Sequence, residues 1–269
     1  MINTDYHTHT SYSIDGSDSM AAMAAKAAAL GLRQMVFTDH EDYQADGSPF
    51  PHQMSFDKYI AEFGRVKRQY ADRVELLLGV EFGLAPRINH KLESLAARYP
   101  LEFIIGSSHD IEAKDLYNGE FFLGRDIHAA HRAYFEEVLQ NVRTTDAYDV
   151  YGHIDYIVRY GGYQPNELRY SDHADIIDEI LRELIARGKG LELNTSGYRY
   201  GLNCTHPQPD ILKRYRQLGG EIITIGSDAH RALDICANFE EARLLLLQTG
   251  FKAYTLFRNR RPYWADLES

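Results

Sequence analysis

Histidine and carboxylate side chains recur in short motifs along the chain. The first motif, DYHTHTSYSIDG, places His7 and His9 one residue apart and Asp15 six residues later. Similar residue types recur in TDH, GVEFG, SSHD, GHID and SDAH. Nine side chains in these motifs have donor atoms suited to a divalent metal ion: His7, His9, Asp15, His40, Glu81, His109, His153, Asp228 and His230. Imidazole with carboxylate suits zinc, iron or manganese.

A metal cluster explains this set better than packing does. One histidine after a strand is usually a hydrogen-bonded packing residue, but many imidazoles and carboxylates converging on one place would repel one another or lack partners. Bound cations would neutralise them. The ligands are too many for one tetrahedral ion, so we predict two or three divalent ions of zinc, manganese or iron, with positions open to water and substrate.

The cysteines take no part in this prediction. The number and spacing of Cys204 and Cys236 fit neither a disulfide framework nor a zinc motif, and we interpret both as buried or spare thiols. A site without cysteine ligands is typical of catalytic rather than structural zinc. Such ions turn water into hydroxide near neutral pH and stabilise the oxygens of a displacement at phosphorus. Hydrolysis of a phosphoester is therefore the predicted chemistry.

The metal-binding motifs follow short apolar runs that alternate with segments of helical spacing. Strands are predicted at residues 2–6, 34–38, 74–83, 102–106, 149–152, 191–195 and 221–226, with a further run at 254–257. Helices are predicted from residues 17–19 to 31, from 55 to 66, and at 91–99, 126–142, 171–188, 209–219 and 239–248. This alternation predicts parallel strands with helices outside, as a closed barrel or an open doubly wound sheet. In both, active sites lie beyond the carboxyl ends of the strands.

Several helix starts carry capping signals. Ser17, Asp18 or Ser19 can cap the alanine-rich first helix, and Ser55 can cap the second. Ser171 is expected to start the helix that ends near residue 188. These signals place the loops that carry the polar motifs between the strands and the helices.

Length and composition are those of an ordinary globular protein. The chain has 269 residues, 44% hydrophobic and 25% charged, and we predict that residues 1–269 form a single domain. The net charge of −10 disfavours nucleic acid as a partner. No apolar stretch is long enough to span a membrane and no signal segment is present, so we expect no membrane association and a cytoplasmic location. The number of subunits stays open.

The ordered set of motifs resembles the polymerase and histidinol phosphatase (PHP) family. HxH, TDH, GVEFG, SSH, GHID and SDAH occur in this order between residues 7 and 230, so the resemblance covers most of the chain. LELNTSGYR at 191–199, with GHIDYIVRY before it, is similar to the histidinol-phosphate phosphatase branch. The resemblance implies an α/β fold, a distorted (β/α)7 TIM-like barrel, with a trinuclear metal site at the carboxyl ends of its strands.

The resemblance also assigns the ligands to ions. The first ion would be held by His7, His9, Glu81 and Asp228. The second would be held by the bridging Glu81, His109 and His153. The third would be held by Asp15, His40 and His230.

Asp15 departs from the family pattern, because many relatives carry histidine in this last group. A carboxylate is a harder ligand and shifts the preference toward iron, manganese or magnesium. The alternative is that Asp15, which precedes Gly16, closes a turn, and both roles are compatible.

The reaction that the resemblance implies is hydrolysis of L-histidinol phosphate, a small-molecule phosphomonoester, to L-histidinol and phosphate. A hydroxide between the ions would attack phosphorus. Glu81 and Asp228 would be the catalytic residues that hold these ions, and His230 or a metal-bound water would protonate the leaving alkoxide.

Other polar residues near the strand ends are candidates for substrate binding. Arg159 and Arg199 lie just beyond two predicted strands, where their guanidinium groups could bind phosphate oxygens. Asn194 could support the pocket or form a turn, and Asp39 could orient a ligand histidine or cap a loop. Acidic groups near the strand ends could bind the imidazole and ammonium of the substrate, and the candidates are Asp42, Asp110 and Glu112.

Three other functions compete with this prediction. A PHP phosphoesterase could act on nucleotides or DNA ends, and a catalytically silent PHP domain could serve as a metal-binding module. An amidohydrolase-type barrel would need a lysine at a strand end, which the motifs lack. Six histidines follow no common strand-end pattern, and we assign them no role: His52, His90, His128, His131, His173 and His206.

Overall fold

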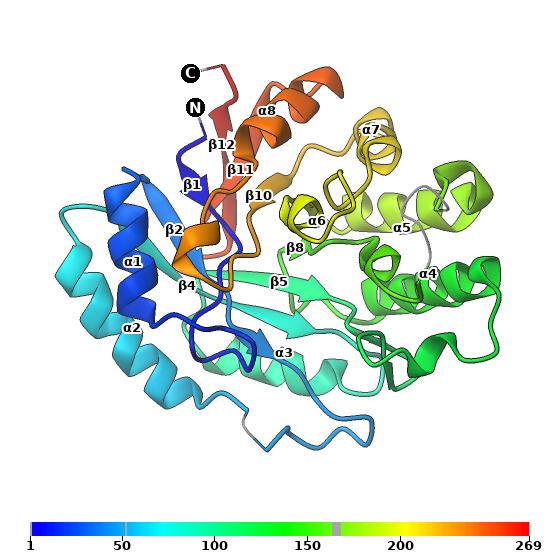
Figure 1. Ribbon diagram of the computed structural model, residues 1–269, viewed down its shortest axis with the longest axis horizontal. Coiled ribbons are helices and arrows are strands. Elements are labelled where there is room, and N and C mark those ends of the chain that lie inside the picture. Colours follow the sequence, from blue (N-terminus) through cyan, green and yellow to red (C-terminus); the bar gives the residue numbers. More distant parts are fainter. Residues whose placement is uncertain (1, 52, 163–167, 269) are drawn as a thin grey trace.

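The computed structural model describes residues 2–51, 53–162 and 168–268, in which seven parallel strands form a nearly closed barrel with helices outside (Figure 1). In their order around the barrel the strands are β1 (Thr4–Asp5), β2 (Gln34–Phe37), β4 (Glu75–Gly83), β5 (Phe103–Ser107), β8 (Val150–Tyr151), β9 (Gly190–Asn194) and β10 (Ile223–Gly226). The barrel, and not the open sheet, is therefore confirmed.

The barrel closes between its first and last strands. The N–H of Tyr6 donates to the carbonyl of Ile225 at 3.1 Å, and the N–H of His9 donates to the carbonyl of Ala229 at 2.8 Å. A parallel bridge between Thr8 and Ala229 continues this pairing beyond the strands. The HxH motif at residues 7–9 and the SDAH motif at residues 227–230 are far apart in the sequence, but they therefore lie side by side.

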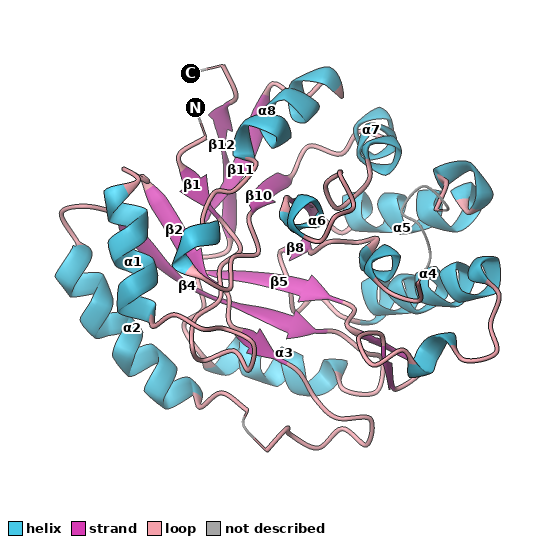
Figure 2. Cartoon of the chain, in the orientation of Figure 1, coloured by secondary structure: helices cyan, strands magenta, loops and turns pink. Residues whose placement is uncertain are grey.

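Helices surround the barrel (Figure 2): α1 (Met20–Ala29), α2 (Phe56–Tyr70), α3 (Asn89–Arg98), α4 (Ile127–Thr144), α5 (Ala174–Ala186), α7 (Pro209–Gln217) and α8 (Phe239–Gln248). The short helix α6 (Ser196–Arg199) follows the carboxyl end of β9. The Ser19 hydroxyl caps α1 by accepting from the N–H of Ala22 at 3.2 Å. Asp126 caps α4 in the same way through the N–H of Ala129 at 3.0 Å. Pro209 begins α7, where its missing N–H costs no helical hydrogen bond.

Two predicted helix starts are confirmed only in part. Ser55 stands at the N-cap of α2, but its side chain makes no capping hydrogen bond. The helix expected from Ser171 begins as a 3-10 turn, η4 (Tyr170–Asp172), and α5 starts only at Ala174. His173 separates them because its backbone, at φ −134° and ψ 21°, is not helical.

The predicted C-terminal run is strand β11 (Ala253–Arg258), and it forms half of a hairpin. Its antiparallel partner β12 (Arg261–Asp266) was not predicted, because RPYWAD has no apolar run. The N–H of Ile223, the first residue of β10, donates to the Thr255 hydroxyl at 3.0 Å. The hairpin therefore packs at the amino ends of the strands and leaves their carboxyl ends to the polar motifs.

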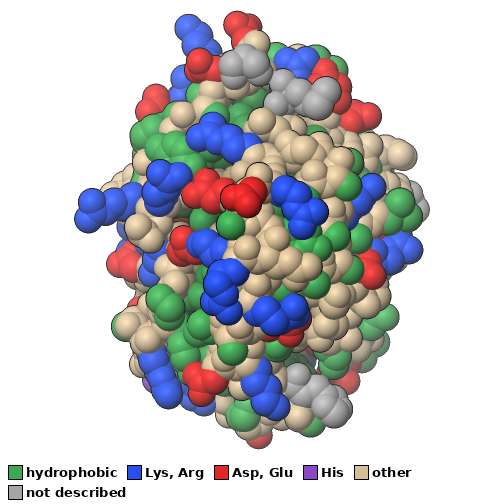
Figure 3. Space-filling model, turned by 90° about the vertical axis from the view of Figure 1, so that its left-hand side faces the viewer, with side chains coloured by type: hydrophobic (Ala, Val, Ile, Leu, Met, Phe, Trp, Pro, Cys, Tyr) green, Lys and Arg blue, Asp and Glu red, His purple; other side chains and the backbone are tan. Residues whose placement is uncertain are grey.

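The remaining elements are short, and most lie in the loops that follow the barrel strands. They are β3 (His40–Glu41), which pairs with β4, the hairpin of β6 (Asp110–Ile111) and β7 (Lys114–Asp115), and the 3-10 turns η1 (Glu120–Phe122), η2 (Tyr156–Arg159) and η5 (Ala232–Asp234). Basic and acidic side chains are interspersed on the face shown in Figure 3, so neither sign forms a continuous patch there. Within the described ranges, no helix combines the length and apolarity needed to cross a membrane.

Candidate metal centre

Glu81, near the end of β4, lies at the centre of the strand-end cluster and is fully buried. Its Oε2 atom lies 3.0–3.4 Å from ring nitrogens of three histidines, His7, His9 and His40. Its Oε1 atom lies 3.0–3.3 Å from ring nitrogens of two more, His109 and His153. One carboxylate is therefore in reach of imidazoles that come from four different strand ends.

The ligand atoms form compact groups in which all lie within 4.8 Å of one another. Two groups consist of residues expected at the first and second ions: His7, His9 and Glu81; and Glu81, His109 and His153. A third group is His9, His40 and His230, and a fourth is His40, Asp42 and His109. The structure thus supplies several adjoining sets of donors, each able to hold a cation.

Asp228, which follows β10, lies beside the first and third groups. Its Oδ1 atom is 3.5 Å from Nε2 of His9, 3.7 Å from Nε2 of His7 and 3.5 Å from Nδ1 of His230. Its backbone has φ +55°, in the left-handed region that residues other than glycine rarely adopt. Strain of this kind is tolerated where it places a functional side chain, and here it turns the carboxylate toward the cluster.

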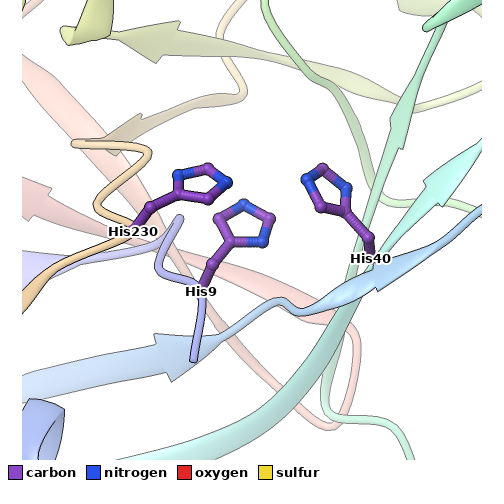
Figure 4. Close-up of side chains that lie close together, drawn as sticks. All are labelled: His9, His40 and His230. Atoms are coloured by element: carbon purple, nitrogen blue, oxygen red, sulfur yellow. The ribbon is translucent and has the colours of Figure 1, made fainter. Parts of the chain in front are cut away.

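Asp15 contacts the outer part of the cluster. Its carboxylate oxygens lie 3.1 Å from Nε2 of His230 and 3.8 Å from Nε2 of His40. The rings of His9, His40 and His230 converge from three separate segments (Figure 4). The turn that was the alternative role is also present, since the N–H of Gly16 donates to the carbonyl of Ser13 at 3.1 Å. Asp15 therefore closes a turn and also lies beside the group of His9, His40 and His230, although none of the compact groups includes it.

Hydrogen bonds fix the tautomer of His9. The Ser13 hydroxyl donates its one proton to the Asp39 carboxylate, at 2.7 Å, so its oxygen must accept from Nδ1 of His9, at 3.0 Å. Asp39 itself is held by the backbone N–H and hydroxyl of Thr10. Asp39 can therefore orient His9 indirectly, through the Ser13 hydroxyl. The remaining nitrogen, Nε2 of His9, presents its lone pair to the cluster.

The tautomer of His7 is fixed by a carboxylate inside the barrel. Nδ1 of His7 lies 2.5 Å from Oε1 of Glu192 and must donate, because a carboxylate only accepts. Space for this contact exists because residue 226 is glycine: a Cβ there would lie 2.3 Å from the Glu192 oxygen and 2.4 Å from Cβ of His7. Nε2 of His7 therefore also presents a lone pair.

These two lone pairs test whether a cation fits. The Nε2 atoms of His7 and His9 are 2.9 Å apart, and both rings are fully buried. In neutral rings two lone pairs at that separation repel one another. A metal ion relieves this, and so does a proton on Nε2 of His7, because Glu192, Glu81 and Asp228 outweigh burial and raise the pKa of His7 well above its usual range. The Glu81 and Asp228 carboxylates lie next to both nitrogens, so the charge of a divalent ion would be balanced. The residues present fit a metal ion.

The electrostatics of the two carboxylates agree with this. Burial alone would raise the pKa of Glu81, but His7, His109 and His40 hold it well below its usual range. Burial likewise opposes ionisation of Asp228, and His7 and Arg159 outweigh it, so its pKa is also well below its usual range. Both side chains are therefore carboxylates, the form that binds metal.

Asp42 orients a further histidine. Its Oδ1 atom lies 2.8 Å from Nδ1 of His109, whose Nε2 faces Glu81. A carboxylate bonded to the far nitrogen fixes the ring of a metal-binding histidine and raises its basicity. A Cβ at residue 83 would lie 1.8 Å from Oδ1 of Asp42, so Gly83 is required for this approach.

The two predicted phosphate-binding arginines lie beside Asp228. Nη2 of Arg159 donates to Oδ2 of Asp228 at 3.2 Å. Nη2 of Arg199 donates to the carbonyls of Ser227 and Asp228 at 3.0 and 2.7 Å. Nη1 of Arg199 is buried and has no hydrogen-bond partner among the described residues, so it keeps donors for an anion. Asn194 lies between these groups, with its Nδ2 3.4 Å from Oδ2 of Asp228.

A pocket of about 520 Å³ opens beside the cluster, and His40 and His109 form part of its wall. Its acidic lining residues are Asp15, Asp42, Asp110, Asp115 and Glu120. Of the three acidic residues singled out in the sequence, Glu112 does not line the pocket and is paired with Arg125. The pocket is thus negatively charged next to the candidate metal centre.

Three residues beside the cluster were not predicted from the sequence: Ser13, Glu192 and His206. Glu192 carried a signal, since it is the one carboxylate in the apolar strand motif LELNT. His206 had none, because it lies in a loop, yet it bonds to Arg159. Of the other histidines left without a role, four contribute to none of the ligand groups above: His90, His128, His131 and His173. His52 lies outside the described residues.

Comparisons with known proteins agree with this geometry. Residues 5–196 match the family model of the PHP domain. The chain belongs to the PHP family. A histidinol-phosphatase of Lactococcus lactis is 30% identical to it over 258 residues, which cover 96% of this chain and 95% of the relative. A probable histidinol-phosphatase of Clostridium acetobutylicum is 32% identical over 242 residues, covering 88% and 90%.

Two solved structures show the same barrel. The crystal structure of histidinol phosphate phosphatase from Lactococcus lactis, complexed with Zn, L-histidinol and phosphate, superposes with a TM-score of 0.88 at 28% identity, covering 97% of this chain and 99% of that one. A putative histidinol phosphatase from Listeria monocytogenes gives a TM-score of 0.73 at 19% identity, covering 88% and 99%. The second likeness concerns the fold alone.

Proposed function

We propose that this PHP chain is a histidinol-phosphatase, which hydrolyses L-histidinol phosphate to L-histidinol and phosphate in histidine biosynthesis. The observation that carries the proposal is the buried cluster around Glu81, with Arg159 at its edge, in a chain that matches histidinol-phosphatases along nearly its whole length. We further propose that residues 1–269 act as one catalytic domain on a small-molecule phosphomonoester.

We propose two or three divalent ions of zinc, manganese or iron as the cofactors. Three sets of residues would hold them: His7, His9, Glu81 and Asp228; Glu81, His109 and His153; and Asp15, His40 and His230. Such ions lower the pKa of bound water and stabilise charge on the oxygens of a phosphoryl group during displacement. Ser13, Glu192 and Asp42 hold the ligand histidines in place from behind.

The phosphate would bind next to Asp228. Arg159 and Arg199 approach this residue from two sides, and each keeps a donor group for phosphate oxygens. Arginine suits this role because its planar guanidinium matches the geometry of a phosphate. The leaving alkoxide needs a proton, for which His230 and a water molecule are the candidates, and His230 lies 3.5 Å from Oδ1 of Asp228.

The rest of the substrate would occupy the acidic pocket. L-Histidinol carries an ammonium and an imidazole, and nearby carboxylates stabilise the positively charged form of both groups. Asp110 is paired with Arg87, and Asp42 is bonded to His109, so part of each carboxylate is already used by a protein partner and is not open to substrate. Asp115 and Glu120 also line the pocket and add negative charge that would attract the cationic end of the substrate.

The test is a substrate comparison on purified, metal-analysed protein. We expect the highest kcat/KM on L-histidinol phosphate, with nucleoside bisphosphates and single-stranded DNA turned over slowly or not at all. Faster turnover of a nucleotide would favour the alternative phosphoesterase. Bound metal without hydrolysis of any phosphomonoester would favour the catalytically silent module. Replacement of Glu81 by glutamine should abolish both metal retention and phosphate release, which checks that the activity belongs to this cluster.

A further inference from the structure

A chain of hydrogen bonds runs from Arg159 away from the candidate metal centre. Nε of Arg159 donates to Nε2 of His206 at 3.1 Å, and Nδ1 of His206 lies 2.6 Å from Oδ1 of Asp155. His206 and Asp155 are both fully buried. Asp155 precedes the turn η2 that ends with Arg159, whereas His206 comes from the loop between α6 and α7.

The direction of each hydrogen bond in this chain follows from the groups involved. A guanidinium N–H can only donate, so Nε2 of His206 accepts with its lone pair. A carboxylate only accepts, so Nδ1 of His206 carries the proton and donates it to Asp155. His206 is therefore held in a single tautomer by a partner on each side.

The backbone ties His206 to the barrel. Asn194, the last residue of β9, exchanges two hydrogen bonds with it: the N–H of Asn194 donates to the carbonyl of His206 at 2.7 Å, and the N–H of His206 donates back at 2.9 Å. The second carboxylate oxygen of Asp155 accepts from the N–H of Gln208 at 2.8 Å. The imidazole is thus anchored to a strand end, although it lies in a loop.

The guanidinium of Arg159 is held on its other edges as well. The side chain is 4% exposed and lies between the rings of Tyr156 and Tyr200, whose centroids are 4.7 and 4.4 Å from its Cζ. Its Nη2 atom donates to Asp228 and to the Ser196 hydroxyl. Within the described part of the chain, no hydrogen bond uses Nη1. This end of the guanidinium is therefore the one left for a ligand.

We propose that His206 is a positioning residue for phosphate binding, which fixes the rotation of the Arg159 guanidinium so that Nη1 is kept for a phosphate oxygen. The inference rests on the proposed function, in which Arg159 binds the phosphate of the substrate. Without an acceptor at Nε2, the buried Nε–H would lack a partner, and the guanidinium would turn to recover one. The guanidinium would then no longer be held in the orientation that binds phosphate, and phosphate affinity would fall because ordering the side chain costs free energy on binding.

Two substitutions of His206 separate this role from a structural one. In His206→Asn the short amide can still donate to Asp155 but cannot reach Arg159. In His206→Gln the longer amide can present its carbonyl to Nε of Arg159. We expect His206→Asn to raise the KM for L-histidinol phosphate and the Kd of inorganic phosphate about tenfold, with kcat changed less, and His206→Gln to stay closer to wild type.

Phosphate binding is measured by calorimetry on the zinc-loaded protein, with zinc content and melting temperature for every variant. His90→Asn, on an exposed part of α3, is the matched control and should behave as wild type. In an Arg159→Ala background, His206→Asn should add no further loss of phosphate affinity. A folded His206→Asn that binds phosphate as tightly as wild type overturns the proposal, as do equal losses in both His206 variants.

Two further results keep the test decisive. Long-range 1H–15N spectra of the wild type should show His206 protonated at Nδ1, with an Nε2 signal that moves in Arg159→Ala. Protonation at Nε2 would overturn the proposal without any His206 variant. If the wild type binds phosphate but hydrolyses no L-histidinol phosphate, the proposed function fails, while the calorimetric comparison still decides the role of His206.

Discussion

Nε2 of His7 and Nε2 of His9 face one another at 2.9 Å, and neither ring is free to turn away. Glu192 holds the opposite nitrogen of His7, and Ser13 holds that of His9. The pair is therefore preorganised to share one cation, and without a metal ion the raised pKa of His7 keeps a proton there that a metal must displace. Only the folded barrel brings these ligands together, so metal binding should be linked to protein stability.

Removal of metal should lower the melting temperature. A ligand that binds only the folded state adds about 2.7 kcal/mol of stability when its free concentration is 100 times its Kd. We expect chelation to lower the melting temperature, and zinc to restore it in step with the metal content found by elemental analysis. His7→Ala should reduce this response, whereas the exposed His90→Ala should leave it unchanged. A melting temperature independent of metal would contradict the linkage.

Loss of the Ser13 hydroxyl should weaken metal binding without touching a ligand atom. Ser13 connects Nδ1 of His9 to Asp39, and removal of such a supporting group costs about 10- to 100-fold in metal affinity. We expect Ser13→Ala to weaken zinc binding by this amount in a competition titration with a chelating dye. Ser13→Thr keeps a hydroxyl and should retain more affinity. Equal zinc affinities in Ser13→Ala and wild type would exclude a role for the Asp39–Ser13–His9 hydrogen bonds in metal binding.

The alternation of strands and helices predicted parallel strands and the convergence of nine side chains, whereas the family resemblance favoured a barrel over an open sheet. In a barrel of parallel strands all carboxyl ends meet at one face, so polar residues after successive strands converge whatever their separation in the chain. For this reason Nε2 of His7 and Oδ1 of Asp228 are 3.7 Å apart, although the two residues lie near opposite ends of the chain. The alternation of strands and helices was sufficient to place them on that face.

The residues behind the cluster could not be predicted in the same way. Glu192 points into the barrel from within a strand, and its partner becomes evident only when Gly226 brings β10 close. His206 lies in a loop, and its contact with Arg159 depends on how that loop packs against β9. Strand β12 escaped detection because its residues gain stability mainly by pairing with β11. Such contacts depend on tertiary packing, which leaves no periodic signal.

Asp15 offers a test of the third ion. It lies 3.1 Å from Nε2 of His230 and is 56% exposed in its side chain, so replacement should disturb little of the core. We expect Asp15→Asn to lose one ion per chain in elemental analysis, while the ions near Glu81 are retained. Asp15→His should keep that ion and shift the preference toward zinc over manganese, because imidazole is a softer ligand. An unchanged metal content and preference in both variants would leave Asp15 with its turn alone.

Acid should destabilise the fold through a histidine that belongs to none of the ligand groups. His131, on the inner side of α4, is almost fully buried. Burial, together with neighbouring His173 and His128, lowers the pKa of His131 from 6.5 to about 4. The unfolded chain therefore binds a proton at this residue at a pH where the folded chain does not.

The sign follows from that difference: between pH 6.5 and about 4 the unfolded state binds more protons at His131, so the free energy of unfolding falls as the pH is lowered through this window. His131→Gln removes the ionisable group and should make stability less dependent on pH there. Urea unfolding of metal-free protein at several pH values measures this, since protonation of the metal ligands then affects both proteins alike. His90→Gln, which removes an exposed histidine, should retain the slope of the wild type. Parallel profiles for His131→Gln and wild type would mean that His131 takes up its proton equally in both states.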